Sequence, residues 1–107
     1  MAEIIDLTED NFDEKTKKGK WIVDIWAVWC GPCKLMKKEI EEAAKSIGDK
    51  INFAKVNIDE NYNLAQKFEI RAVPTLLFIK DGEIIDASVG MLPKDQIVEL
   101  AEEIFGK

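Results

Sequence analysis

The chain has 107 residues, of which 47% are apolar and 34% are charged, and these values fit one folded domain and exclude a disordered chain. Its 15 basic and 21 acidic residues give a net charge of −6, which repels phosphate backbones and anionic lipids, so neither nucleic acid nor a membrane is an expected partner. No apolar run approaches the roughly 20 residues that span a bilayer, and the first residues lack the features of a signal peptide, so we expect a single domain over residues 1–107 in the cytoplasm.

The N-terminal part of the chain predicts a short strand and a short helix. Residues 3–7 are a short apolar stretch, and Thr8 follows as a candidate N-cap of a helix. Glu9 and Asp10 are placed to favour the positive end of that helix. The helix should run for about two turns and stop at residues 17–19.

A buried strand and a long helix should follow. Residues 21–28 are apolar without alternation, apart from Asp24, which is typical of a central strand covered on both faces. After the two cysteines, apolar residues recur at helical spacing and make one stripe: Met36, Ile40, Ala43, Ala44 and Ile47. Gly48 is placed to end this helix.

The second half of the chain predicts a strand, a short helix and a terminal hairpin. Residues 51–57 indicate a strand, and residues 59–67 indicate a helix. Residues 76–79 are strand-like, and Asp81-Gly82 after them is a strong hairpin turn signal. The last two strands should therefore be antiparallel.

Gly90 closes the last strand, and a final helix starts near Pro93 and buries a stripe of apolar residues: Ile97, Leu100, Ala101, Ile104 and Phe105. The predicted element order is β-α-β-α-β-α-β-β-α. Early strands that alternate with helices pair in parallel through right-handed crossovers. The expected fold class is therefore α/β, with a central mixed sheet of parallel strands plus a C-terminal antiparallel hairpin, flanked by helices on both faces.

The only two cysteines, Cys30 and Cys33, stand where the apolar run gives way to the long helical pattern. Two cysteines are too few to staple a small secreted scaffold, and a chain without histidine cannot complete a four-ligand zinc site from Cys and His alone. On a helix, residues three apart have Cβ atoms roughly 5–6 Å apart, which is close to disulfide range. The sequence therefore predicts a reactive dithiol that opens and closes without refolding, and no metal site within one chain.

Two segments carry a family resemblance. Residues 23–34 read Val-Asp-Ile-Trp-Ala-Val-Trp-Cys-Gly-Pro-Cys-Lys and resemble the active-site signature of the thioredoxin family, and residues 71–76 resemble its segment with a cis-proline, here Pro74. The likeness covers nearly the whole chain and implies the thioredoxin fold and a protein-disulfide reductase that needs no cofactor beyond its own cysteines. Lys38 departs from the pattern, because many thioredoxins have a proline there that kinks the helix. Tyr62 likewise stands where some members have proline.

Thiol–disulfide exchange gives the two cysteines different tasks. Cys30 at the helix start is the expected nucleophile, since unpaired N–H groups and the helix dipole favour its thiolate. Cys33, one turn further in, should be more buried and is the expected resolving thiol. Between them, Gly31 leaves one side of Cys30 open, and Pro32 is pre-organised for the first helical turn. Disulfide isomerases and strong oxidants that resemble this fold have a histidine in that pair, so proline indicates the reducing end.

Asp24 lies six residues before Cys30 on a strand that should be buried, and an isolated buried carboxylate has a raised pKa. In the thioredoxin family the matching aspartate accepts a proton from the resolving cysteine through water, near a lysine that here would be Lys55. This role is implied by the resemblance alone. The alternative is an aspartate turned to solvent at a strand edge.

Apolar residues around Cys30 should form a docking rim that binds extended protein segments by shape and backbone hydrogen bonds. We expect Trp26 in the core and Trp29 at an exposed edge of the site. The docking rim comprises Trp29, Gly31, Pro32, Val73, Pro74, Gly90 and Met91. Three lysines fit a solvated helix face better than a source of local positive potential: Lys34, Lys37 and Lys38.

The leading hypothesis is a monomeric dithiol electron carrier that reduces disulfides in client proteins and is itself re-reduced by a thioredoxin reductase. A second is a disulfide isomerase or a glutathione-linked relative. A third is a binding module without catalysis that uses the same docking rim. A fourth is a dimer that holds zinc or an iron–sulfur cluster through two pairs of Cys30 and Cys33. The sequence does not name the electron donor of the reductase.

Overall fold

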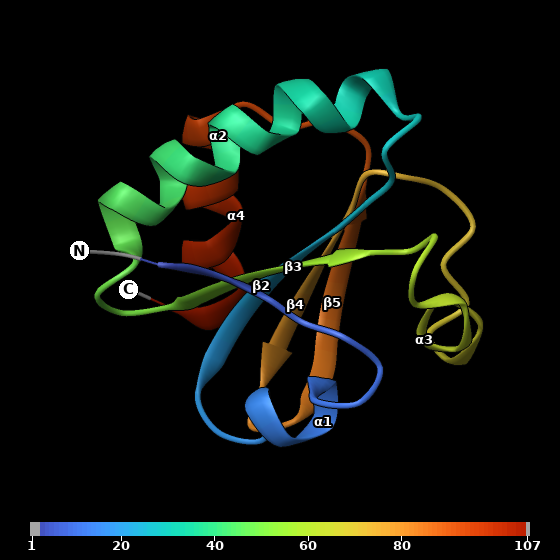
Figure 1. The fold of residues 1–107 in the computed structure, drawn as a ribbon. Coiled ribbons are helices and arrows are strands. Elements are labelled where there is room, and N and C mark those ends of the chain that lie inside the picture. Colours follow the sequence, from blue (N-terminus) through green and yellow to red (C-terminus); the bar gives the residue numbers. More distant parts are fainter. Residues whose placement is uncertain (1–2, 107) are drawn as a thin grey trace.

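The computed structural model describes residues 3–106, and in this range five strands form one sheet with helices on both faces (Figure 1). The strands are β1 (Ile4–Asp6), β2 (Lys20–Trp26), β3 (Asn52–Asn57), β4 (Thr75–Lys80) and β5 (Glu83–Val89). The helices are α1 (Phe12–Lys15), α2 (Gly31–Ile47), α3 (Tyr62–Lys67) and α4 (Lys94–Phe105). The predicted element order and the predicted α/β class are confirmed.

The strand order of the sheet is β1-β3-β2-β4-β5, which puts β2 in the centre. Strand β3 pairs in parallel with both β1 and β2, whereas β4 pairs antiparallel with β2 and β5 pairs antiparallel with β4. Residues 21–25 are all buried, so the apolar run without alternation is the central strand, as predicted. The strand ends at Trp26, and Val28 beyond it is exposed.

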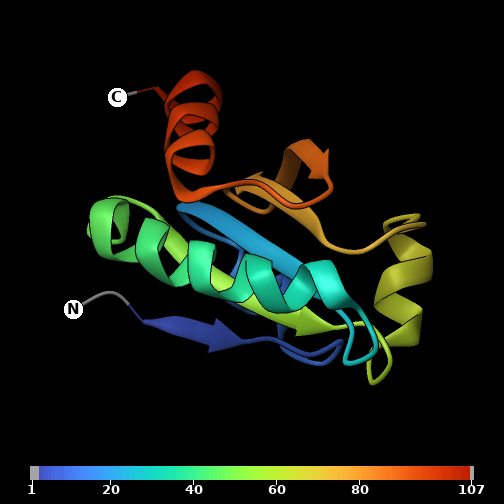
Figure 2. The same cartoon turned by 90° about the horizontal axis from the view of Figure 1, so that it is seen from above.

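Strand β2 divides its side chains between two cores. Ile22 packs with residues of α2 and α4 on one face of the sheet, and Val23 and Ile25 pack with residues of α1 and α3 on the other. Figure 2 shows the first of these faces, where α2 lies across the sheet. Because side chains alternate along a strand, Asp24 lies on the same face as Ile22 and beneath α2.

The first helix is shorter than predicted, because α1 is a single turn and Thr8 is not its N-cap. Asn11 takes the N-cap position, but its Oδ1 accepts a hydrogen bond from the backbone N–H of Thr8 at 2.8 Å instead of from the helix. At the other end, the hydroxyl of Thr16 donates to the carbonyl of Phe12 at 2.9 Å. Local hydrogen bonds of short polar side chains thus compete with the helix at both ends and limit its length.

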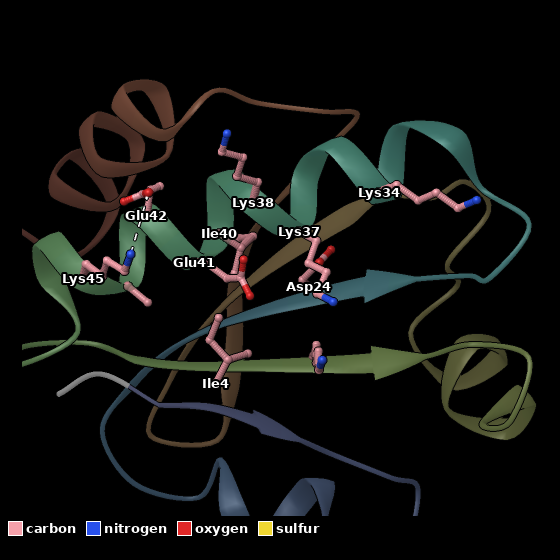
Figure 3. A pocket seen from close by; sticks show the side chains of 11 residues that line it. Ile4, Asp24, Lys34, Lys37, Lys38, Ile40, Glu41, Glu42 and Lys45 are labelled. Carbon is pink, nitrogen blue, oxygen red and sulfur yellow. Dashed lines mark ion pairs between the residues drawn. The ribbon is translucent and has the colours of Figure 1, made fainter.

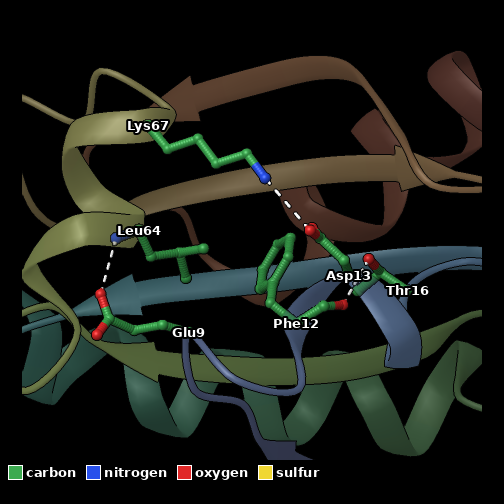
Figure 4. A network of polar contacts seen from close by, with 6 residues as sticks. All are labelled: Glu9, Phe12, Asp13, Thr16, Leu64 and Lys67. Atoms are coloured by element: carbon green, nitrogen blue, oxygen red, sulfur yellow. Dashed lines mark hydrogen bonds and ion pairs between the residues drawn. The ribbon is translucent and has the colours of Figure 1, made fainter.

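Glu9 serves α3 and not α1. Its carboxylate accepts a hydrogen bond at 3.2 Å from the N–H of Leu64 in the first turn of α3, and this N–H also donates to the carbonyl of Asn61 at 3.1 Å (Figure 4). The buried side chain of Asn61 strengthens this link, because its Oδ1 accepts from the N–H of Glu9 at 2.9 Å. Nearby, Lys67 pairs with Asp13 at 3.3 Å. The prediction for Glu9 is wrong because donors distant in sequence compete with the nearby helix end.

The remaining elements follow the predictions closely. Asp81 and Gly82 both have positive φ angles, 48° and 87°, as a two-residue hairpin turn requires. Helix α2 continues through Lys38 without a break and ends at Gly48. Helix α3 begins at Tyr62, later than expected. Between residues 3 and 106, none of the helices has the length and apolar character needed to cross a bilayer.

Candidate active site

The two cysteines lie at the junction between β2 and α2. Cys30 is the N-cap of α2 and has an extended backbone, with φ −93° and ψ 111°. Gly31 and Pro32 begin the helix and are both exposed. Proline costs no hydrogen bond there, because the first N–H groups of a helix lack partners within it. The predicted placement of Cys30 at the helix start and Cys33 one turn inside is confirmed.

A disulfide joins Cys30 and Cys33, whose Cα atoms are 5.3 Å apart. The backbone N–H of Cys33 donates a hydrogen bond to Sγ of Cys30 at 3.1 Å. Such a donor at a helix N-terminus, together with the helix dipole, stabilises negative charge on sulfur. The arrangement therefore favours a thiolate on Cys30 when the disulfide is open. In the described part of the chain, no group of three or more His, Cys, Asp or Glu side chains is arranged as a metal site.

The two cysteines do not differ in burial. Each residue is 4% exposed, and both belong to one small buried cluster with Ala27. The prediction that Cys33 is the more buried residue is wrong for the disulfide form, because the bond holds both sulfurs in the same cluster. The two residues differ in their surroundings, since Cys33 lines a cavity beneath α2 and Cys30 does not.

Residues of the predicted docking rim that are distant in sequence meet beside the disulfide. Val73 packs against the cysteine cluster, and the peptide bond between Val73 and Pro74 is cis, as predicted. The N–H of Gly90 donates to the carbonyl of Pro74 at 2.8 Å, which brings the loop with Gly90 and Met91 to the same place. Trp29 and Met91 are exposed, at 69% and 38%. Pro74 itself is buried, so its side chain does not form part of the exposed docking rim, contrary to the prediction.

The two tryptophans near the site differ in exposure: Trp29 lies at an exposed edge as expected, whereas Trp26 is only partly buried and not, as expected, in the core. Trp26 is half-buried against the cysteine cluster, and within residues 3–106 its indole N–H has no hydrogen-bond partner. The indole N–H of exposed Trp29 donates to Oδ1 of Asp59 at 3.2 Å, and Ile58 packs against the cysteine cluster. We did not predict Ile58 and Asp59 from the sequence. Their position directly after β3 could have indicated them. Strands β2 and β3 are parallel, so the residues that follow each strand meet at the same edge of the sheet.

Asp24 is buried in the centre of the sheet with a lysine beside it. The register pairs Asp24 with Lys55 on β3 and with Leu76 on β4. Asp24 is 4% exposed, and among the described residues its Oδ1 has no hydrogen-bond partner. Burial raises the pKa of Asp24 to about 7, although the positive charge of Lys55 lowers it in part. The alternative of a solvent-facing aspartate at a strand edge is therefore wrong.

Lys55 lies between two carboxylates. On its other side the register pairs it with Asp6 of β1, and the Lys55 Nζ lies 3.8 Å from Oδ1 of Asp6. The side chain of Lys55 is 30% exposed, while that of Asp6 is 77% exposed. A row across β1, β3 and β2 thus reads acid, base, acid, and the charge of Lys55 is shared between a solvated and a buried carboxylate.

A cavity of about 220 Å³ reaches from Asp24 to Cys33. Asp24, Lys55 and Cys33 line it, together with Trp26 and two lysines of α2. This volume is room for several water molecules, through which a proton can pass between a thiol and a carboxylate. The structure therefore brings together the three groups that the resemblance linked.

The two lysines of α2 in this cavity are Lys34 and Lys37. Both also line a larger groove of about 840 Å³ that continues along α2 towards β1, where Lys38 joins them (Figure 3). All three lysines are exposed, so the predicted solvated face exists. The prediction of a solvated face is incomplete, because Lys34 and Lys37 also line the cavity of Asp24. Which side of a helix turns towards the sheet is set by packing, and the spacing of lysines does not show it.

Comparisons with known proteins agree with this site. The thioredoxin family model matches residues 3–103 of the chain. Thioredoxins of Staphylococcus saprophyticus and Bacillus subtilis are 43% and 40% identical to it over 100 residues, covering 94% of this chain and 96% of each relative. The crystal structure of the Malassezia sympodialis thioredoxin superposes with a TM-score of 0.86 at 32% identity, covering 97% of this chain and 92% of that one. The chain therefore belongs to the thioredoxin family, and Cys30–Cys33 is its redox-active disulfide.

Proposed function

We propose that this chain carries electrons to the disulfides of client proteins, with Cys30 as the attacking thiolate and Cys33 as the resolving thiol. The observation that carries this assignment is the hydrogen bond from the N–H of Cys33 to Sγ of Cys30 at 3.1 Å. The donor points at the sulfur that caps α2, and no second sulfur shares this position. Negative charge is therefore stabilised on Cys30 before a client arrives.

The exchange runs in two displacements. The Cys30 thiolate attacks one sulfur of the client disulfide, a bond forms between Cys30 and that sulfur, and the other client sulfur leaves as a thiolate. Cys33 then loses its proton and attacks Sγ of Cys30, which breaks the mixed disulfide and releases the second client thiolate. Two electrons pass from the dithiol to the client, and the Cys30–Cys33 disulfide is regenerated.

Asp24 is the proposed acceptor of the Cys33 proton, acting through water in the cavity that both residues line. A pKa of about 7 supports this role, because a base works best when its pKa is close to the working pH. Lys55 tunes that base from the neighbouring strand, since its charge favours the carboxylate form. These roles depend on groups that β2, β3 and α2 hold in fixed positions.

Substitution of Asp24 by asparagine should slow the resolving step at neutral pH by about 100-fold, the lower end of what a positioned proton acceptor contributes. Attack by Cys30 should remain largely intact, because its thiolate depends on α2. Stopped-flow kinetics with a client disulfide between pH 6 and 9 separate the two steps. Asp49→Asn is the matched control, because Asp49 is exposed beyond the far end of α2. An Asp24→Asn rate equal to that of the control across this range would remove the role.

The docking rim is the proposed contact surface for clients, which bind it as extended segments. Trp29 offers the largest exposed apolar side chain at the site and is held by its hydrogen bond to Asp59. Trp29→Ala should raise KM for a protein client about tenfold with little change in kcat, as loss of one aromatic anchor does. Ile85→Ala, another exposed apolar residue but on β5, serves as the control. Equal KM values for the two variants would contradict the placement of clients on this surface.

The proposal also covers the reductase, the oligomeric state and the cellular location of the chain. The oxidised chain is re-reduced by a thioredoxin reductase, acts as a monomer and a single domain, and works in the cytoplasm, where a reducing dithiol has a supply of electrons. Insulin reduction coupled to two candidate reductases, one that uses NADPH and one that uses ferredoxin, tests this proposal. Turnover with one of them is the expected result. Turnover with neither, when dithiothreitol still supports insulin reduction, would contradict the reductase assignment.

A further inference from the structure

The cavity of Asp24 opens into the groove that runs along α2. The cavity and the outer groove share four lining residues, Asp24, Lys34, Lys37 and Lys55, so the two spaces meet there. Val73, Pro74, Gly90 and Met91 line neither space. A client that covers the docking rim therefore leaves the groove open to solvent.

Lys37 stands where the cavity and the groove meet. It follows Cys33 by one helical turn on α2, so the two side chains emerge from the same face of the helix. Figure 3 shows the side chain of Lys37 descending from α2 towards Asp24, whereas Lys38 points away from the sheet. Lys38 lines the outer groove and not the cavity. Two adjacent lysines of one helix thus differ in their relation to the buried carboxylate.

The strands beside Asp24 supply only one positive charge, and that charge is shared with a second carboxylate. Lys55 faces Asp24 from β3 but also pairs with Asp6 of β1 at 3.8 Å. The neighbour on β4 is the uncharged Leu76. Lys37 itself forms no ion pair within 4.0 Å among residues 3–106. The remaining groups of the cavity and groove that carry charge or titrate all come from α2: Cys33, Lys34, Lys38, Glu41, Glu42 and Lys45.

We propose that Lys37 is a positioning residue for the proton transfer, stabilising the Asp24 carboxylate from the mouth of the cavity while Asp24 passes its proton to solvent through the groove. The inference rests on the proposed role of Asp24 as proton acceptor. In the mixed disulfide the docking rim is covered, and the proton that Cys33 gives to Asp24 leaves along α2. The ammonium of Lys37 lowers the cost of the carboxylate that remains after the proton departs.

The test compares Lys37→Gln with Lys38→Gln, which removes the same charge from the next residue of the same helix, and with Lys37→Arg, which keeps the charge. The midpoint of Asp24 is followed by carboxyl carbon NMR in the reduced protein, and the pH profile of the resolving step is measured beside it. In Lys37→Gln both midpoints should rise by about 0.5 pH unit at low salt, and this shift should shrink towards zero in about 1 M salt as the charge is screened. Lys38→Gln and Lys37→Arg should keep the wild-type values.

Equal midpoints in Lys37→Gln and Lys38→Gln would overturn the role of Lys37, whether both shift or neither does. A shift that persists undiminished in high salt would overturn it too, because the effect would not be electrostatic. The role of Asp24 is decided separately by the Asp24→Asn kinetics. If that variant resolves slowly and the two lysine variants titrate alike, the proposed function stands and the inference on Lys37 fails.

Discussion

Replacement of Cys33 by serine should trap a covalent complex between Cys30 and a client protein, whereas replacement of Cys30 should abolish both reduction and trapping. The first displacement needs only the Cys30 thiolate, which the N–H of Cys33 stabilises as a backbone group that serine retains. The second displacement needs the Cys33 sulfur, and a serine hydroxyl cannot replace it. Each substitution should lower client reduction by at least about a thousandfold, as loss of a nucleophile does, but only one should accumulate an intermediate.

Intact mass and non-reducing gels after mixing each variant with oxidised insulin distinguish the two cysteines. Alkylation of the reduced wild type adds an independent measurement, and Cys30 should react first. A faster reaction of Cys30 would agree with its position as the N-cap of α2, where its thiolate is stabilised. Trapping by Cys30→Ser in place of Cys33→Ser would reverse the assignment, and equal alkylation of both would remove its basis.

The sequence predicted local structure well where the type of residue at a position limits the conformation or burial of its neighbours. A single carboxylate inside an apolar run without alternation favours a buried position over a solvent-facing one, and Asp24 is buried. The dipeptide Asp81-Gly82, whose residue types readily adopt positive φ angles, predicts the hairpin that pairs β4 with β5, and it forms that turn. In both cases the physical constraint acts between neighbours in the chain. The partner of Asp24 is different, because nothing local links residues 24 and 55, and only the family resemblance indicated Lys55.

Predictions failed or were incomplete where groups distant in sequence compete. Glu9 has the chemistry to stabilise the start of α1, but its carboxylate accepts a hydrogen bond from Leu64 in the first turn of α3. The disulfide removes the difference in burial that helix position predicts for Cys30 and Cys33. The sequence alone does not distinguish Lys37 from Lys38. The packing of α2 on the sheet turns Lys37, and not Lys38, towards the cavity. The functional site is therefore less predictable than the fold, since it combines side chains from three separate elements.

Asp24→Asn should stabilise the folded protein at neutral and alkaline pH and have little effect in acid. The pKa of Asp24 is about 7 in the folded protein against 3.8 for an unperturbed aspartate, so between these values the folded state binds more protons than the unfolded state. Stability must then fall as pH rises from about 4 to about 7. The difference of about 3 pH units corresponds to about 4 kcal/mol, which the wild type loses across this window. Asparagine has no such titration and avoids the loss.

Thermal and denaturant unfolding of wild type, Asp24→Asn and Asp49→Asn from pH 4 to pH 9, all in the disulfide form, measure this difference. At pH 8 the melting temperature of Asp24→Asn should exceed that of the wild type by about 10 °C or more, and the gap should close as pH falls towards 4. Asp49→Asn should follow the wild type throughout. A gap that does not change with pH would mean that the carboxylate is solvated in the folded state. The substitution that stabilises the folded state at neutral and alkaline pH also removes the proposed proton acceptor, so the most stable form of this site should also be the slowest to resolve a mixed disulfide.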